Sequence, residues 1–200
     1  MKADSEQANG TGQSNHVGQE FGRRVRAARE RAGLTLEQLS QGSGVSRAML
    51  SKVERGDKSP TLGVAMRIAG GLDLSLSSLI DVEGHLRASA IVRKGERPTF
   101  RDEQSGFERQ VLSPITPGSA AELLFHHLPA RTSTGELPPY PVGTEKHVIV
   151  REGLLTVTIG GLEVKLGEGD TLLFEPTVPF SFDNRSDEPC GYYLVVTRCP

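Results

Sequence analysis

The spacing of apolar side chains divides the chain into two parts. Up to about residue 80, apolar residues recur every three or four positions, as on the buried side of an α-helix. Beyond about residue 86, short β-type runs are interrupted by glycine and proline. We therefore expect two domains of different class, a compact all-α domain followed by an all-β domain.

The first part predicts five short helices, each with a local start or stop signal. Thr35 and Gln38 have the spacing of a capping box at the start of the second helix. Ser46, Thr61 and Ser75 are suitable N-caps for the next three helices. We expect the following apolar residues to be buried: Phe21, Val25, Ala28, Ala32, Leu36, Leu39, Met49, Leu50, Val53, Leu62, Ala65, Ile68, Ala69, Leu72, Leu76, Leu79 and Ile80.

The helix predicted from Ser46 to Gly56 has one apolar side and one donor-rich side. Its polar side carries long basic side chains and a single acid, Glu54. The break at Gly42-Ser43-Gly44 joins this helix tightly to the preceding one, which is the spacing of a helix-turn-helix. Such a surface suits phosphates and base edges, so the sequence favours nucleic-acid binding here.

The second part predicts about nine strands at close and regular spacing, which indicates a sandwich or a barrel. The predicted strands are Ala90–Val92, Glu108–Leu112, Ala121–Leu128, His147–Val150, Leu154–Ile159, Leu162–Leu166, Thr171–Phe174, Phe180–Phe182 and Gly191–Thr197.

Composition and charge add an asymmetry between the two parts. The chain has a net charge of −2, but residues 17–80 are basic and the residues from 84 onward are acidic. Residues 1–17 are polar with hardly an apolar side chain, so we predict a disordered tail there. Two cysteines near the C-terminus favour free thiols. Without a signal peptide or a membrane span, we expect a cytoplasmic protein with no membrane partner.

Three motifs in the helical part resemble the XRE (xenobiotic-response-element), phage-repressor-like family of helix-turn-helix proteins. They are Leu34-Thr35-Leu36-Glu37-Gln38-Leu39, Leu50-Ser51-Lys52-Val53-Glu54-Arg55-Gly56 and Ser59-Pro60-Thr61, and the resemblance covers residues 18–82. It implies that the Ser46 helix enters the major groove of DNA. Positions matching Arg29 and Glu54 pair in that family and brace the helix. The DNA-binding residues that we expect are Arg47, Ala48 and Lys52 at base edges, Thr35, Arg55 and Lys58 at phosphates, and Ser46 and Ser51 on the same surface.

The second part resembles the cupins, whose fold is a small β-barrel (a double-stranded β-helix). The stretches Gly143–Gly153 and Gly169–Asn184 match the two cupin motifs in spacing. Both halves together resemble XRE–cupin transcription regulators of bacteria. At the positions of the cupin metal ligands, however, this chain has Pro139, Pro141, Lys146 and Phe180, and none of these side chains suits a metal ion.

We therefore expect no metal, no cofactor and no catalytic residues in the barrel. His126 and His127 are neighbours on a predicted strand, so they point to opposite faces and cannot chelate one ion together. His147 should point outward because it neighbours an inward position.

Lys146 should point into the barrel, where a lone ammonium group is costly without a partner. The sequence leaves two alternatives open for this ammonium group. It either pairs with an internal acid or extends to the barrel mouth, or it pairs with the anionic group of a ligand. For the second alternative, the expected ligand-binding residues are Arg109, Tyr140, Lys146 and Phe180.

These features favour a transcription regulator, more often a repressor in this family, in which a metal-free barrel senses a small molecule. We expect a homodimer on a pseudo-palindromic DNA operator. The alternatives are a metal-dependent cupin oxygenase or isomerase with an added helical head, and a barrel that only dimerises. The expected boundaries are 1–17 for the tail, 18–82 for the DNA-binding domain, 83–105 for a linker with the first strand or strands, and 106–200 for the sensor domain.

Overall fold

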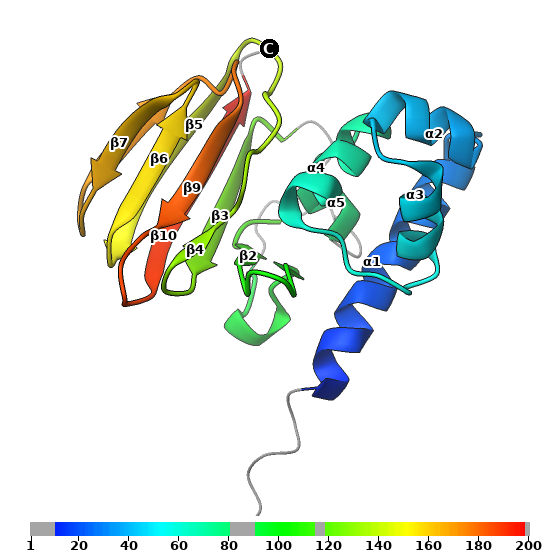
Figure 1. Cartoon of the computed structure of the whole chain (residues 1–200), viewed down its shortest axis with the longest axis horizontal. Helices are drawn as coiled ribbons and strands as arrows, with labels where there is room; N and C mark the ends of the chain where they lie inside the picture. Colours follow the sequence, from blue (N-terminus) through cyan, green and yellow to red (C-terminus); the bar gives the residue numbers. More distant parts are fainter. Residues whose placement is uncertain (1–10, 81–90, 115–118, 199–200) are drawn as a thin grey trace, which may run out of the picture.

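The computed structural model describes residues 11–80, 91–114 and 119–198 as a helical domain beside a β-barrel (Figure 1). The sequence prediction of an all-α domain followed by a cupin-type barrel is confirmed. The α-helices of the described residues are α1 (Thr11–Arg31), α2 (Leu36–Ser43), α3 (Arg47–Glu54), α4 (Leu62–Gly71) and α5 (Leu76–Ile80), and a 3₁₀ turn, η1, follows at Lys94–Glu96.

The helix α1 begins at Thr11, so its first seven residues lie within the predicted tail. For residues 11–17 the prediction of disorder is therefore wrong, and residues 1–10 lie outside the described part of the chain. Once part of a helix is formed and held by packing, each further residue that joins it gains one hydrogen bond. The helix can therefore extend through polar sequence at a small cost in free energy. Phe21, Val25 and Ala28 supply that packing, because all three are buried where α1 packs on its neighbours. Ala32 lies beyond the last helical residue and is exposed.

The start and stop signals of the helices are confirmed in the structure. Thr35 and Gln38 form both hydrogen bonds of the capping box. Ser46, Thr61 and Ser75 each accept a hydrogen bond from a backbone N–H three residues later. Gly44 ends α2 with φ of 64°, a left-handed conformation that favours glycine. These local bonds set the ends of the two helices that form the helix-turn-helix.

The barrel consists of two antiparallel sheets around one apolar core. One sheet has the strand order β1-β2-β3-β10-β5-β8 and the other has the order β4-β9-β6-β7. Rings of Phe182 in β9 and Tyr192 in β10 lie 5.2 Å apart, so the two sheets share this core. The strands are β1 (Thr99–Arg101), β2 (Glu108–Val111), β3 (Ala121–Leu128), β4 (Thr132–Ser133), β5 (Thr144–Glu152), β6 (Leu155–Ile159), β7 (Leu162–Leu166), β8 (Thr171–Phe174), β9 (Phe180–Asn184) and β10 (Cys190–Arg198).

Eight of the nine predicted strands match observed strands, and the strand predicted at Ala90–Val92 is wrong. Ala90 lies outside the described residues, and Ile91 lies in an irregular segment with 75% of its surface exposed. A run of three apolar residues is too short to show the alternation of a strand. Such a run forms a strand only where a partner strand lies beside it. The sequence placed the first strand or strands within residues 83–105 but did not give the bounds of the three-residue β1, and it did not predict the two-residue β4.

The helical domain and the barrel touch through buried polar and aromatic contacts. The carboxylate of Asp102, next to β1, accepts a hydrogen bond of 3.2 Å from the N–H of Leu62 at the start of α4. The rings of Phe21 in α1 and Phe100 in β1 meet edge to face at 5.9 Å. Among the described helices, none is both long and apolar enough to span a membrane.

Candidate nucleic-acid interface and ligand site

The helix α3 presents its polar side to solvent and its apolar side to the helical core. Leu50 and Val53 are buried, and Met49 is partly buried against the same core. Arg47 and Lys52 on the other side are exposed. Of the eight residues expected to contact DNA, Thr35, Ser46, Arg47, Ala48, Lys52, Arg55 and Lys58 are exposed and Ser51 is half-buried.

Four of these eight residues also make contacts within the protein. Thr35 and Ser46 accept cap hydrogen bonds at the starts of α2 and α3. Free N–H groups at a helix start attract an anion, so this geometry suits a phosphate near both caps. Arg55 donates to the hydroxyl of Ser51 and to the carboxylate of Asp57, the latter at 2.7 Å. Asp57 therefore offsets part of the positive charge that Arg55 offers to a phosphate.

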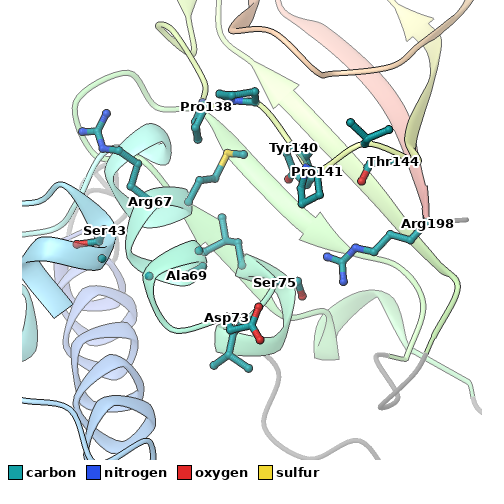
Figure 2. Close-up of a pocket in the computed structure, with 18 of the residues that line it drawn as sticks. Ser43, Arg67, Ala69, Asp73, Ser75, Pro138, Tyr140, Pro141, Thr144 and Arg198 are labelled. Carbon is teal, nitrogen blue, oxygen red and sulfur yellow. The ribbon is translucent and has the colours of Figure 1, made fainter. Parts of the chain in front are cut away.

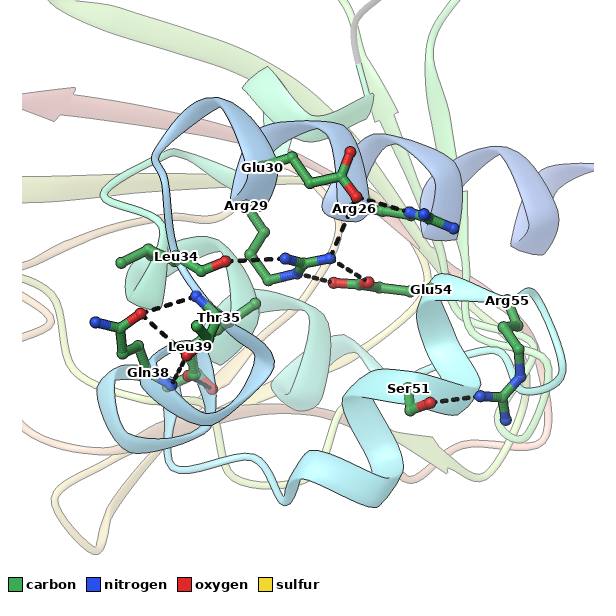
Figure 3. A network of polar contacts seen from close by, with 11 residues as sticks. Arg26, Arg29, Glu30, Leu34, Thr35, Gln38, Leu39, Ser51, Glu54 and Arg55 are labelled. Carbon is green, nitrogen blue, oxygen red and sulfur yellow. Dashed lines mark hydrogen bonds and ion pairs between the residues drawn. The ribbon is translucent and has the colours of Figure 1, made fainter.

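A half-buried ion pair fixes α3 against α1, as the family resemblance implied. Arg29 donates two hydrogen bonds to the carboxylate of Glu54, at 2.7 and 3.0 Å, and a third to the carbonyl oxygen of Leu34 at 2.9 Å (Figure 3). The Arg29 and Glu54 side chains are only 13% and 7% exposed. The bonds to Glu54 raise the pKa of Arg29 above its usual value. This pair sets the orientation of the helix that carries Arg47 and Lys52.

Lys146 points into the barrel and is almost fully buried, as the sequence predicted. Its amine lies 4.2 Å from the ring centre of Tyr140 and 5.2 Å from that of Phe180. Burial lowers the pKa of Lys146 to about 7, and the positive charge of Arg109 acts in the same direction. Within the described residues the amine has no hydrogen bond and no ion pair, so the alternative of an internal acid finds no partner residue there.

His126 lies deeper in the barrel among aromatic rings. Its Nδ1 lies 3.0 Å from the hydroxyl of Tyr192, and burial lowers the pKa of His126 well below its usual value. The phenol of Tyr192 has no other partner among the described residues, and it can donate its proton to Nδ1 in the tautomer of His126 that is protonated on Nε2. The Nε2 of His126 then carries the remaining proton of a neutral imidazole. This Nε2 is buried and unpaired within the described residues.

Arg109 connects the barrel interior to the helical domain. Its Nη2 donates to the hydroxyl of Ser77 in α5 at 2.7 Å and contacts Glu122 at 3.3 Å. Ser77 in turn donates to Glu122 at 2.8 Å, and Arg198 approaches the same carboxylate at 3.5 Å. The Nε of Arg109 is buried and has no partner in the described part of the chain. A buried cation of the barrel is thus bonded directly to a DNA-binding domain helix.

A pocket of about 540 Å³ lies where α4 and α5 face the barrel (Figure 2). The loop before β5 contributes three prolines and Tyr140 to its wall. Since Tyr140 also lies against Lys146, its ring separates this pocket from the barrel interior. The pocket includes Pro139 and Pro141, two of the positions that the cupin resemblance assigns to metal ligands.

The histidines lie as the alternation of strand residues predicted. His126 is buried and its neighbour His127 is half-buried, while the side chain of His147 is 43% exposed and lies near Glu145. In the ranges that the structure describes, no three residues of the types His, Cys, Asp and Glu are grouped to hold a metal ion. Cys190 is a buried free thiol, and Cys199 lies outside those ranges.

Sequence reasoning named Lys146, Tyr140, Phe180 and Arg109 as candidate ligand-binding residues. It did not predict all the residues that they contact. The expected walls of Lys146 are confirmed by its contacts with Tyr140 and Phe180. Nothing in the sequence indicated Ser77 as the partner of Arg109, because the two residues are 32 positions apart. The inward direction of His126 follows from alternation along β3, but its unpaired Nε2 required the structure.

Comparison with known proteins agrees with both halves of the structure. A family model described as a helix-turn-helix matches residues 25–79, and one described as a cupin domain matches residues 134–196. The HTH-type transcriptional regulator SutR of Escherichia coli is 25% identical over 175 residues, which is 86% of this chain and 91% of SutR. The uncharacterized HTH-type transcriptional regulator YazB of Bacillus subtilis is 33% identical over 63 residues, covering 32% of this chain and 91% of YazB.

One solved structure, an HTH_3 family transcriptional regulator from Vibrio cholerae, has the same fold over nearly the whole chain. Its TM-score is 0.75 at 21% identity, and the match covers 93% of this chain and 99% of that one. The helix-turn-helix and cupin matches together with the named relatives thus define a DNA-binding transcriptional regulator with a cupin domain. The chain belongs to the family of HTH-type transcriptional regulators.

Proposed function

We propose that the cupin barrel of this regulator binds a small anionic effector, without a metal ion, and thereby changes DNA binding. The observation that carries this proposal is a set of buried nitrogen atoms without hydrogen-bonding partners. Arg109 Nε and His126 Nε2 are unpaired among the described residues, and Lys146 has no hydrogen-bonding partner there. Buried polar groups are normally paired, so unpaired donors in a barrel interior favour a ligand that accepts from them.

The charges in the barrel favour an anion over a neutral ligand. Lys146 and Arg109 both act on His126, since the positive charge of each lowers the pKa of the imidazole. Glu122 is the nearby acid, and it is already bonded to Ser77 and Arg109. An oxyanion would raise the pKa of Lys146 by stabilising its ammonium form. Binding would therefore take up protons above pH 7, and the affinity for the anion should weaken as the pH rises.

The route from the barrel to DNA begins at Arg109. An anion that accepts from Arg109 Nε competes with the bonds that hold Arg109 to Ser77 and Glu122. Helix α5 packs on α1, where Arg24 donates to the carbonyl oxygens of Leu79 and Ile80. Helix α1 holds α3 through Arg29. The effector thus acts on the recognition helix through two packed helices.

We further propose that the protein acts in the cytoplasm as a homodimer on a pseudo-palindromic operator. One helical domain with few phosphate contacts binds DNA weakly. A two-fold dimer places two such domains on half-sites about 34 Å apart. The outer face of the larger sheet supports pairing, since its residues Leu123, Ile149 and Leu173 are exposed apolar side chains. Light scattering of the full chain tests this proposal, and a monomer at DNA-binding concentrations would contradict it.

Substitutions in α3 should change DNA specificity and not only affinity. Arg47→Ala or Lys52→Ala should each cost about 1–3 kcal/mol of binding to the operator and relax the preference for its sequence. Lys58→Ala should weaken all sequences alike and reduce the salt dependence by about one unit. Titrations of operator and random duplex at two salt concentrations measure both effects. An unchanged operator preference in all three variants would exclude α3 as the recognition helix.

The effector proposal is tested by a thermal-shift screen of metabolites, followed by DNA titration with each hit. A ligand that binds only the native state raises the midpoint by mass action. Lys146→Met should abolish the response of DNA binding to an anionic effector, and Lys165→Met, an exposed lysine of β7, should keep it. A full response of DNA binding to the effector in Lys146→Met would show that Lys146 does not bind the effector. A stoichiometric transition metal in untagged protein would revive the enzyme alternative.

A further inference from the structure

The pocket between the domains carries opposite charges on its two walls. The helical domain contributes Asp73, just after α4, and the barrel contributes Arg198 at the end of β10. Figure 2 shows the two side chains pointing toward one another across the pocket. They form no ion pair within 4.0 Å, so a gap separates the carboxylate from the guanidinium.

Both charged groups have bonding capacity left for a ligand. Asp73 is exposed, and its carboxylate has no hydrogen-bond or ion-pair partner among the described residues. Arg198 has one ion pair, from Nη2 to Glu122 at 3.5 Å, which leaves its Nε and Nη1 free within the same residues. Thr144 lines the pocket beside Arg198, and its buried side chain forms no hydrogen bond in the described structure. Asp73 also has a positive φ of 56°, which aspartate tolerates better than most residues.

The pocket also contains apolar side chains that its own walls leave uncovered. Leu74 from the helical domain is 37% exposed, and Val142 from the barrel loop is 87% exposed. Exposed apolar groups on the two sides of one pocket would gain stability if an apolar ligand body covered them. The pocket thus offers an acid, a base and an apolar region between two domains.

We propose that this junction pocket binds an α-amino acid with an apolar side chain. The ammonium group pairs with Asp73, the carboxylate accepts from Arg198 and Thr144, and the side chain covers Leu74 and Val142. A zwitterion satisfies both walls at once, whereas an anion or an amine leaves one charge unpaired. The site is separate from the barrel interior, with the Tyr140 ring between them, and the bound amino acid links the two domains.

Calorimetric titration of the full chain with norleucine, hexanoate and pentylamine tests this site. The three probes share an apolar chain, and the last two each lack one charge of the zwitterion. Norleucine should bind at least tenfold more tightly than either analogue. The twenty standard amino acids are screened in parallel by thermal shift.

The variants are Asp73→Asn, which keeps a residue tolerant of positive φ, and Arg198→Gln. Matched controls are Asp187→Asn and Arg131→Gln, an exposed ion pair on the barrel outside this pocket.

Each variant should abolish the affinity gained from the ligand charge that the replaced side chain pairs with. In Asp73→Asn, norleucine should bind no better than hexanoate, and in Arg198→Gln it should bind no better than pentylamine. Both controls should stay within twofold of the unchanged protein. Equal binding of all three probes, unchanged binding in both variants, or no response to any amino acid would overturn the proposal. Lys146→Met should keep the amino-acid binding, so this site and the barrel effector site fail independently.

Discussion

Replacing Lys146 by methionine should stabilise the folded protein by about 2–4 kcal/mol at pH 6. The folded pKa is about 7, below the ordinary value of 10.5, because the buried ammonium group loses its hydration. At pH 6 the lysine is charged in both states, and only the folded state carries the cost of burying that charge. Methionine has a similar length and no charge, so it removes the cost and keeps the packing against Phe180.

The gain from Lys146→Met should shrink as the pH rises. Between pH 7 and about 10.5 the unfolded chain holds the proton of Lys146 and the folded chain does not. The stability contributed by this residue therefore rises with pH across that window, and the difference between the two proteins closes. Urea unfolding of both proteins at pH 6, 7.5 and 9 measures this difference and cancels the other titrating groups.

Lys165→Met on the exposed surface of β7 is the control, and its effect should not vary with pH in the same window. A Lys146→Met variant that is less stable than the parent at pH 6 would mean that the ammonium group has a stabilising partner. The expected result has a functional meaning, because a residue that costs stability is retained only where another property needs it. Ligand binding by Lys146 is that property in our proposal.

Local signals explain why the sequence predicted the helical domain well. The capping box at Thr35 and the N-caps at Ser46 and Thr61 involve residues three positions apart, so their chemistry is visible in the sequence. Long strands such as β3 were equally clear, because eight residues suffice to show alternation. The two-residue β4 has no such pattern and exists because it pairs with β9.

The candidate ligand sites depend on contacts that no local pattern contains. The inward direction of Lys146 follows from the alternation of β5, and Tyr140 was named from the sequence only as a candidate wall beside it. The bond from Arg109 to Ser77 requires the docking of one domain on the other. The same docking brings Asp73 opposite Arg198, two residues that are unremarkable charged side chains in the sequence.

Breaking the pair between Arg29 and Glu54 should destabilise the helical domain by about 2–4 kcal/mol. Arg29→Met leaves the carboxylate of Glu54 with only 7% of its side chain exposed and no cation beside it, and it also removes the bond to the carbonyl oxygen of Leu34. Glu54→Met leaves the guanidinium of Arg29, whose side chain is 13% exposed, with only the carboxylate of Glu30 at 3.5 Å. Each change should also lower affinity for all DNA sequences, because α3 loses its main polar anchor to α1.

The double variant Arg29→Met, Glu54→Met separates the value of the pair from the cost of an unpaired charge. It should be more stable than either single variant, since two apolar side chains leave no buried charge behind. Arg26→Met is the control, because Arg26 pairs with Glu30 on the same helix with 62% and 53% of the side chains exposed, and Glu30 lies 3.5 Å from Arg29 in the parent protein as well. Its cost should stay within about 0.5 kcal/mol. Chemical unfolding and DNA titration of the four variants measure both properties. Single variants at the Arg29–Glu54 pair that cost no more than Arg26→Met would show that helix packing alone positions α3.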